Sequence, residues 1–136
     1  MHQIIHPDGW KPARGYANGV LAEGACLHIA GQIGWNNDQA LERHDFIGQL
    51  EQALANVVAV VETAKGRRED IVRMTWYVVD KKEYLSKLKE VGEAYRRIMG
   101  RHFPAITMVI VAGLLEEAAL IEIEATAILP AADGRA

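Results

Sequence analysis

The 136-residue sequence contains a single cysteine and no strong excess of either charge. Cys26 has no second cysteine with which to form an internal disulfide, which is typical of a protein in a reducing compartment. Hydrophobic residue types make up 50% of the chain, enough for a packed core without disulfides or metal. At this length we predict one domain over residues 1–136.

Three further absences bear on partners and location. The net charge of −3 argues against nucleic acid and against an anionic membrane surface, since both select basic proteins. The longest apolar run, residues 106–115, is too short to cross a bilayer. The N-terminal segment lacks the basic region and long apolar stretch of an export signal. These features predict a soluble, cytoplasmic protein.

The strong catalytic and binding motifs are also missing. The sequence has no phosphate-binding glycine loop, no pair of histidines at helical spacing and no nucleophile elbow. Its five histidines are scattered without ligand spacing, which favours structural or surface roles. We therefore predict no metal site.

Hydrophobic periodicity predicts seven elements in the order β-β-α-β-α-β-β. A short edge strand or loop is expected before residue 16. Glycine 24 offers the positive φ of a hairpin turn between the first two strands, and Asp45 and Gly66 are expected to cap the first helix. The remaining predicted elements are a strand within residues 70–80, a helix over 81–99 ended by Gly100, and strands over 105–111 and 119–129.

Strand-helix-strand crossovers favour parallel pairing and terminal hairpins favour antiparallel pairing, so a mixed sheet is expected. Right-handed crossovers place both helices on one face and leave the other bare. In the last strand, Ile121 and Ile123 would face the helices, and Glu122 and Glu124 the bare side. The strand over 105–111 is apolar on both faces, which predicts a symmetric oligomer that covers the bare face.

Glu122 and Glu124 are the most informative candidates for chemistry. A carboxylate covered by a neighbouring subunit has a pKa that is easily raised into the range useful for proton transfer. The alternative is an ion pair with a basic residue of the next chain. Trp10 and Trp35 follow glycines in loops, where they would either line a pocket or plug the ends of the sheet. Trp76 is expected in the core or an interface.

The segments "GYANGV", "LHIAGQIGW", "QALANVVAVVETAKG", "DIVRMTWYVVD", "EAYRRIMGRHFPA" and "IEIEATAI" together carry a family resemblance. In their order and spacing, the sequence resembles the Rid (YjgF) family, the reactive-intermediate deaminases, over almost its whole length. The resemblance implies an α+β fold like that of chorismate mutase, a homotrimer, and small-molecule pockets between subunits. Deaminase members hydrolyse imines or enamines to a keto acid and ammonia without metal or cofactor.

The resemblance also assigns site positions. Tyr16 matches the family tyrosine, and Glu122 matches the glutamate that helps hold the attacking water. Gly31 matches the glycine of the "GQ" turn, preceded by Ala30 where many members have serine. Met108 stands where some members have cysteine.

One position departs from the family pattern in a way that changes the chemistry. Deaminase members follow their proline-alanine pair with an arginine that clamps the substrate carboxylate, whereas here Pro104-Ala105 is followed by Ile106. Imines derived from amino acids should therefore bind poorly. Arg14 or Arg73 are candidates to supply a replacement charge.

Three hypotheses follow. The first is a divergent hydrolase for a small, less anionic or aromatic substrate, with Glu122 and Tyr16 as catalytic residues and Trp35, Ile106 and Met108 as an apolar wall. The second is a trimer that binds or senses a metabolite without catalysis. The third is a ribonuclease or translation inhibitor, which the acidic charge makes the weakest of the three.

Overall fold

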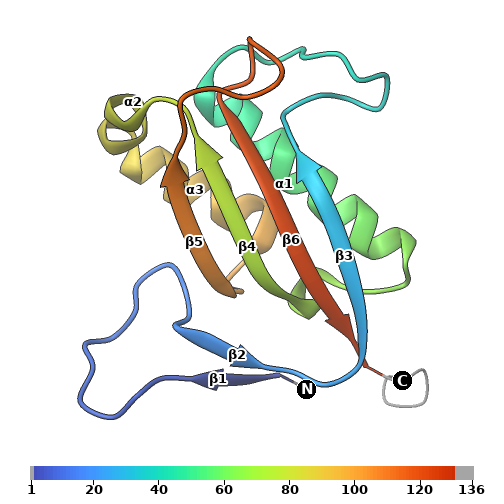
Figure 1. Ribbon diagram of the computed structural model, residues 1–136, viewed down its shortest axis with the longest axis vertical. Helices are drawn as coiled ribbons and strands as arrows, with labels where there is room; N and C mark the ends of the chain where they lie inside the picture. Colours follow the sequence, from blue (N-terminus) through green and yellow to red (C-terminus); the bar gives the residue numbers. More distant parts are fainter. Residues whose placement is uncertain (1, 131–136) are drawn as a thin grey trace.

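The computed structural model describes residues 2–130, in which two main helices lie against one face of a sheet (Figure 1). Within these residues the sheet has four strands in the order β3-β6-β4-β5. The helices are α1 (Phe46–Thr63) and α3 (Leu88–Met99), and the short α2 (Lys81–Ser86) precedes α3. The strands are β3 (Ala25–Gln32), β4 (Ile71–Val78), β5 (Ala105–Ile110) and β6 (Ile121–Leu129).

The sheet is mixed, as predicted. β4 and β5 are parallel neighbours joined by the crossover through α2 and α3, while β6 runs antiparallel to both β3 and β4. The predicted α+β class with two helices on one face is therefore confirmed. We call the sheet face opposite these helices the open face, since no described helix covers it (Figure 1).

Both predicted hairpins are wrong. β2 (Gly19–Leu21) pairs with β1 (Gln3–Ile5) in a separate two-stranded sheet, and β3 pairs with β6 instead. Gly24 does have a positive φ of 147°, but a Cβ there would lie 2.2 Å from the carbonyl oxygen of Leu129. The chain is thus pressed against the end of β6 rather than folded back on β2. At the other end, β4 lies between β5 and β6.

The alternation predicted for β6 is confirmed. Ile121 and Ile123 are fully buried on the helix side, whereas Glu122 is half-buried and Glu124 exposed on the open face. The core between sheet and helices is apolar, and its largest fully buried side chains include Phe46, Leu50, Leu54, Ile71, Met74, Met99, Ile121 and Ile123.

Helix α1 begins at its predicted cap, because Asp45 Oδ2 accepts a hydrogen bond from Gly48 N at 2.9 Å. Its C-terminal end differs from the prediction by one residue. Lys65, with a φ of 69°, adopts the left-handed conformation, and the Gly66 N–H donates to the carbonyl oxygen of Val61 at 2.9 Å. This is the Schellman pattern with lysine where glycine usually stands.

The helix predicted over residues 81–99 is broken at Lys87 into α2 and α3. Asp80 caps α2 by accepting a hydrogen bond from Glu83 N at 3.1 Å, and Gly100, with a φ of 64°, ends α3 as expected. The break brings Tyr84 of α2 and Leu88 of α3 to the edge of the same cavity. No helix within residues 2–130 is long and apolar enough to span a membrane.

Candidate functional site

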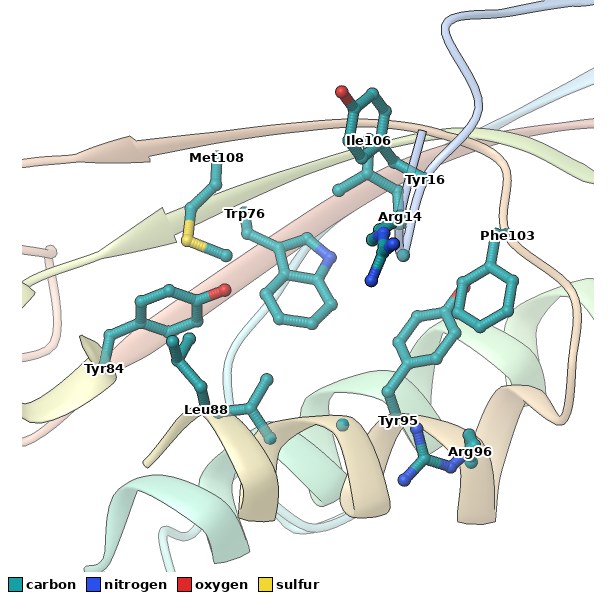
Figure 2. Close-up of a pocket in the computed structure, with 13 residues that line it drawn as sticks. Arg14, Tyr16, Trp76, Tyr84, Leu88, Tyr95, Arg96, Phe103, Ile106 and Met108 are labelled. Carbon is teal, nitrogen blue, oxygen red and sulfur yellow. The ribbon is translucent and has the colours of Figure 1, made fainter. Parts of the chain in front are cut away.

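A cavity of about 410 Å³ lies between α2–α3, the edge of the sheet and the loop that precedes β2 (Figure 2). Its volume is within the range of small-molecule sites. We call it the aromatic pocket because its walls include Tyr16, Trp76, Tyr84, Tyr95 and Phe103. Ile106, Met108, Val91, Leu88, Arg14 and Arg96 also line it.

Strand register explains why Ile106 and Met108 reach this pocket. They pair with Met74 and Trp76 of β4, whose side chains are buried on the helix side, so all four point the same way. Both residues belong to β5, the edge strand of the sheet, and stay half-buried. The structure thus brings together Tyr16, Ile106 and Met108, which the sequence analysis proposed as site residues.

Ring contacts fix the back wall of the pocket. Tyr95 stacks on Phe103 with ring centroids 5.2 Å apart, and Trp76 lies 6.1 Å from Tyr95. The Tyr95 hydroxyl donates to the carbonyl oxygen of His102 at 2.5 Å, and burial raises the pKa of this hydroxyl. Trp76 belongs to the core, as predicted, and also forms part of the wall.

The two arginines considered as replacements for the family arginine lie on different faces. Arg14 lines the aromatic pocket together with Ile106. Arg73 is exposed and lines a hollow of about 110 Å³ beside Glu124 on the open face. Arg96 on α3 also lines the aromatic pocket. It was not predicted as a site residue, because an exposed arginine on an amphipathic helix usually belongs to the solvated face.

The other predicted site residues gather on the open face. β3 is irregular between Ile29 and Gln32, and this bulge contains Ala30 and Gly31. A Cβ on Gly31 would lie only 1.9 Å from Oε2 of Glu122. The absence of a side chain at residue 31 therefore lets the Glu122 carboxylate lie directly against the β3 backbone. We call Ala30, Gly31 and Glu122 the open-face site.

The two glutamates of β6 differ in their partners. Glu124 accepts a hydrogen bond from the Tyr77 hydroxyl, which raises the pKa of this phenol. Glu122 forms no hydrogen bond or ion pair with any residue in the described range 2–130. Of the two carboxylates, Glu122 is thus the one available to a ligand or to a neighbouring chain.

The aromatic pocket and the open-face site lie on opposite sides of the same sheet. Ile106 points to the helix side, while Glu122 pairs with Tyr77 and points away from the helices. One chain therefore does not bring Tyr16 and Glu122 together. A site that uses both requires two chains, with the aromatic pocket of one facing the open face of the other.

The loop tryptophans lie apart from the aromatic pocket. Trp35 is half-buried after β3, and its carbonyl oxygen accepts from Asn56 Nδ2 at 2.8 Å. Asn56 Nδ2 also donates to the carbonyl oxygen of Ile33 at 3.1 Å, so this side chain bonds the backbone of the segment after β3. Trp10 is 60% exposed and lines a separate open hollow with Tyr16. Within one chain, Trp35 forms no wall with Ile106 and Met108.

No group of three or more histidine, cysteine, aspartate or glutamate side chains in residues 2–130 is arranged to hold a metal ion. The polar groups of the two sites are instead hydroxyl, guanidinium and carboxylate groups and one indole N–H. These suit the binding of a polar small molecule and proton transfer to it.

The fold is that of a known protein class. Residues 8–129 match the protein family described as Endoribonuclease L-PSP. A RutC family protein of Haemophilus influenzae is 32% identical over 128 residues, covering 94% of this chain and 98% of the relative. The 2-iminobutanoate/2-iminopropanoate deaminase of Salmonella typhimurium is 34% identical over 116 residues, covering 83% and 86%.

Among solved structures, the Rid family protein YyfB of Yersinia pestis superposes with a TM-score of 0.84 at 32% identity. The match covers 94% of this chain and 98% of that one. The chain therefore belongs to the Rid (YjgF) family, as its sequence segments indicated.

Proposed function

We propose that this protein hydrolyses a small imine or enamine at a site completed by two copies of the chain. The observation that supports this most directly is the Glu122 carboxylate, which lies unpaired against Gly31 on the open face. One relative is a deaminase of 2-imino acids, which makes imine hydrolysis the reaction to test first. The family resemblance and the uncovered sheet face together support a homotrimer.

In the proposed reaction, Glu122 accepts a proton from a water molecule as that water attacks the carbon of the C=N bond. Glu122 passes this proton to the nitrogen, which gives a carbinolamine. It then transfers the hydroxyl proton to the amine as the C–N bond breaks, so the products are a carbonyl compound and ammonia. Tyr16, from the facing chain, would hold the substrate by a hydrogen bond. Its hydroxyl lies at the mouth of the aromatic pocket, on the side away from Tyr95 and Arg96 (Figure 2).

Turnover of imines generated in the assay from aliphatic and aromatic amino acids tests this function. Glu122→Gln should lower the rate by about 10²–10⁴-fold, the usual contribution of a positioned acid-base group. Glu124→Gln is the matched control, because Glu124 shares the face and strand but is held by Tyr77. Equal rates for Glu122→Gln and the unmodified protein would rule out the proposed role.

The second candidate is a binding protein without catalysis. Its support is that the aromatic pocket contains no carboxylate among its described lining residues and is walled mainly by apolar groups. The same assay separates the candidates, since a binding protein would retain ligands in the pocket and release no ammonia from any imine. Light scattering at three times the monomer mass is expected for either candidate.

A further inference from the structure

The aromatic pocket combines positive charge with an absence of negative charge. Arg14, from the loop before β2, and Arg96, from α3, both line it, and no aspartate or glutamate does so within residues 2–130. Neither arginine forms an ion pair in that range, whereas Arg43 and Arg97 both pair with Glu51. Two unpaired guanidinium groups at one cavity give it a positive potential that favours an anionic ligand.

Trp76 adds a third hydrogen-bond donor. Trp76 is only 3% exposed, yet its ring nitrogen has no acceptor among the described residues. A buried N–H without an acceptor is costly and rare, so a partner from outside the chain is expected. The nitrogen edge of this ring is turned toward the side of the pocket that holds Arg14 (Figure 2).

Arg96 is placed beside the pocket by a glycine on its own helix. A Cβ on Gly92, one turn earlier, would lie 3.3 Å from Nη1 of Arg96. The bare backbone at residue 92 therefore gives the guanidinium room to lie back along α3, where both residues line the cavity. By contrast, Arg97 on the same helix is held by Glu51 at 2.7 Å.

The remainder of the pocket suits an apolar, flat body. Ile106 and Met108 form one wall, and Tyr84, Val91 and Phe103 lie around them. Burial raises the pKa of the Tyr84 hydroxyl, so this residue is a neutral wall group at physiological pH. In Figure 2 the Arg14 guanidinium and the Trp76 ring nitrogen lie toward one part of the cavity, and Arg96 lies apart from them on α3. Met108, Tyr84 and Leu88 lie on the opposite side of the Trp76 ring.

We propose that the aromatic pocket binds a small ring-bearing monocarboxylate whose carboxylate is held by Arg14 and the Trp76 N–H. Arg96 adds positive charge from α3, and Ile106 contacts the ring. This assignment rests on the proposed function, because it names the ligand class of the same site. It moves the anion-binding position from residue 106 to residue 14, which is why isoleucine at 106 is tolerated.

Calorimetric titration of the full-length protein with four probes tests the ligand class. The probes are 3-phenylpropanoate, its neutral amide 3-phenylpropanamide, propanoate and phenyl phosphate. We expect 3-phenylpropanoate to bind at least about tenfold more tightly than the amide or propanoate, as one charge-assisted contact is worth that much. Its affinity should fall as sodium chloride is raised, since exposed guanidinium groups are screened.

Variants locate the carboxylate. Arg14→Gln should weaken 3-phenylpropanoate by about tenfold or more and leave the amide unchanged. Trp76→Phe keeps a ring and removes the donor, so it should weaken the acid by about threefold or more. Arg96→Gln should have a smaller effect that disappears at high salt. Arg101→Gln is the control, since Arg101 lies on the other hollow.

Equal binding of 3-phenylpropanoate and its amide would overturn this proposal, and so would binding of phenyl phosphate without binding of 3-phenylpropanoate. Unchanged binding of 3-phenylpropanoate by a double variant that carries both Arg14→Gln and Arg96→Gln would also overturn it. So would the absence of binding by all four probes. The proposed function is judged separately by imine turnover of Glu122→Gln, which should fall by about 10²–10⁴-fold. Imine turnover with charge-independent binding would retain the function and reject the ligand class.

Discussion

Glu122 and Gly31 are in direct contact across β6 and β3, with the carboxylate in the space that any side chain at residue 31 would need. Gly31 adopts no left-handed conformation, so the requirement for glycine here is one of space alone. This contact fixes where the Glu122 carboxylate lies on the open face. It also makes residue 31 a sensitive test of the site.

Gly31→Ala should displace the Glu122 carboxylate with little loss of stability. The added methyl group meets the far end of a half-buried side chain, which can rotate away, so the melting temperature should change little. Turnover should fall by about 10²-fold or more, because the proton acceptor is misplaced. Gly113→Ala is the control, since a Cβ there meets nothing within 4 Å. Full activity of Gly31→Ala would show that the position of Glu122 is unimportant.

Ile106→Arg should exchange ligand preference. Residue 106 points into the aromatic pocket beside Met108 and Trp76, so a guanidinium there would face the ligand and displace a ring. Binding of short 2-imino acids or their stable keto-acid analogues should improve by about tenfold or more, because two charge-assisted hydrogen bonds become available. Titration with pyruvate and 3-phenylpropanoate measures both changes.

Ile106→Leu is the matched control, because it keeps the volume and adds no charge. It should leave the order of affinities as in the unmodified protein. If Ile106→Arg binds pyruvate no better than Ile106→Leu does, residue 106 does not face the ligand.

The sequence predicted which residues lie on each face of the strands, and where the helices begin and end, more accurately than which strands pair with each other in the sheet. Alternation in β6 identified Glu122 as an open-face residue, because the two sides of a strand differ in burial. Asp45 was identified as a cap because its side chain acts locally. Pairing depends on contacts far apart in the chain, and nothing local in β6 specifies that it lies between β3 and β4.

The candidate site was also predictable only in part, because local patterns identify its residues but not which strands lie side by side. Tyr16, Ile106 and Met108 were expected to share a pocket and do so. The position of Glu122 on the opposite face from Ile106 became clear only from the register of β4 with its two neighbours. Arg96 carries no distinctive sequence signal except Gly92 one turn before it, which leaves its guanidinium room beside the pocket.

Gln49→Leu should be strongly destabilising. Gln49 is completely buried in α1, and its Nε2 donates to the carbonyl oxygens of Arg43 and Ala118, both at 3.1 Å. Its Oε1 accepts from Leu120 N at 2.7 Å, so one side chain ties the segment before β6 to the helix. Leucine leaves three backbone groups without their partner, at about 1–3 kcal/mol for each that stays buried.

Urea denaturation measures this effect as a lower free energy of unfolding. Gln52→Leu, one turn along the same helix, is the control. It removes a single half-buried hydrogen bond to Asn56 and should cost less than about 1 kcal/mol. Equal costs for the two variants would show that the Gln49 contacts contribute nothing beyond an ordinary side-chain bond.

Asp45→Ala should reduce stability in a pH-dependent way. Loss of an N-cap typically lowers the free energy of unfolding by about 1 kcal/mol.

The hydrogen bond from Gly48 N holds the pKa of the Asp45 carboxyl below its usual value of 3.8. The folded state thus favours the ionised form, so this part of the stabilisation is complete above the usual pKa and is lost as pH falls through the lowered one. The difference between the unmodified protein and Asp45→Ala, measured by urea denaturation, should therefore shrink as pH falls from about 5 through the usual value of 3.8 and below. Asp45→Asn caps without a titratable group, so its advantage over Asp45→Ala should stay constant over the same interval. A difference between the unmodified protein and Asp45→Ala that stays constant over this interval would show that the ionised carboxylate is not what caps α1.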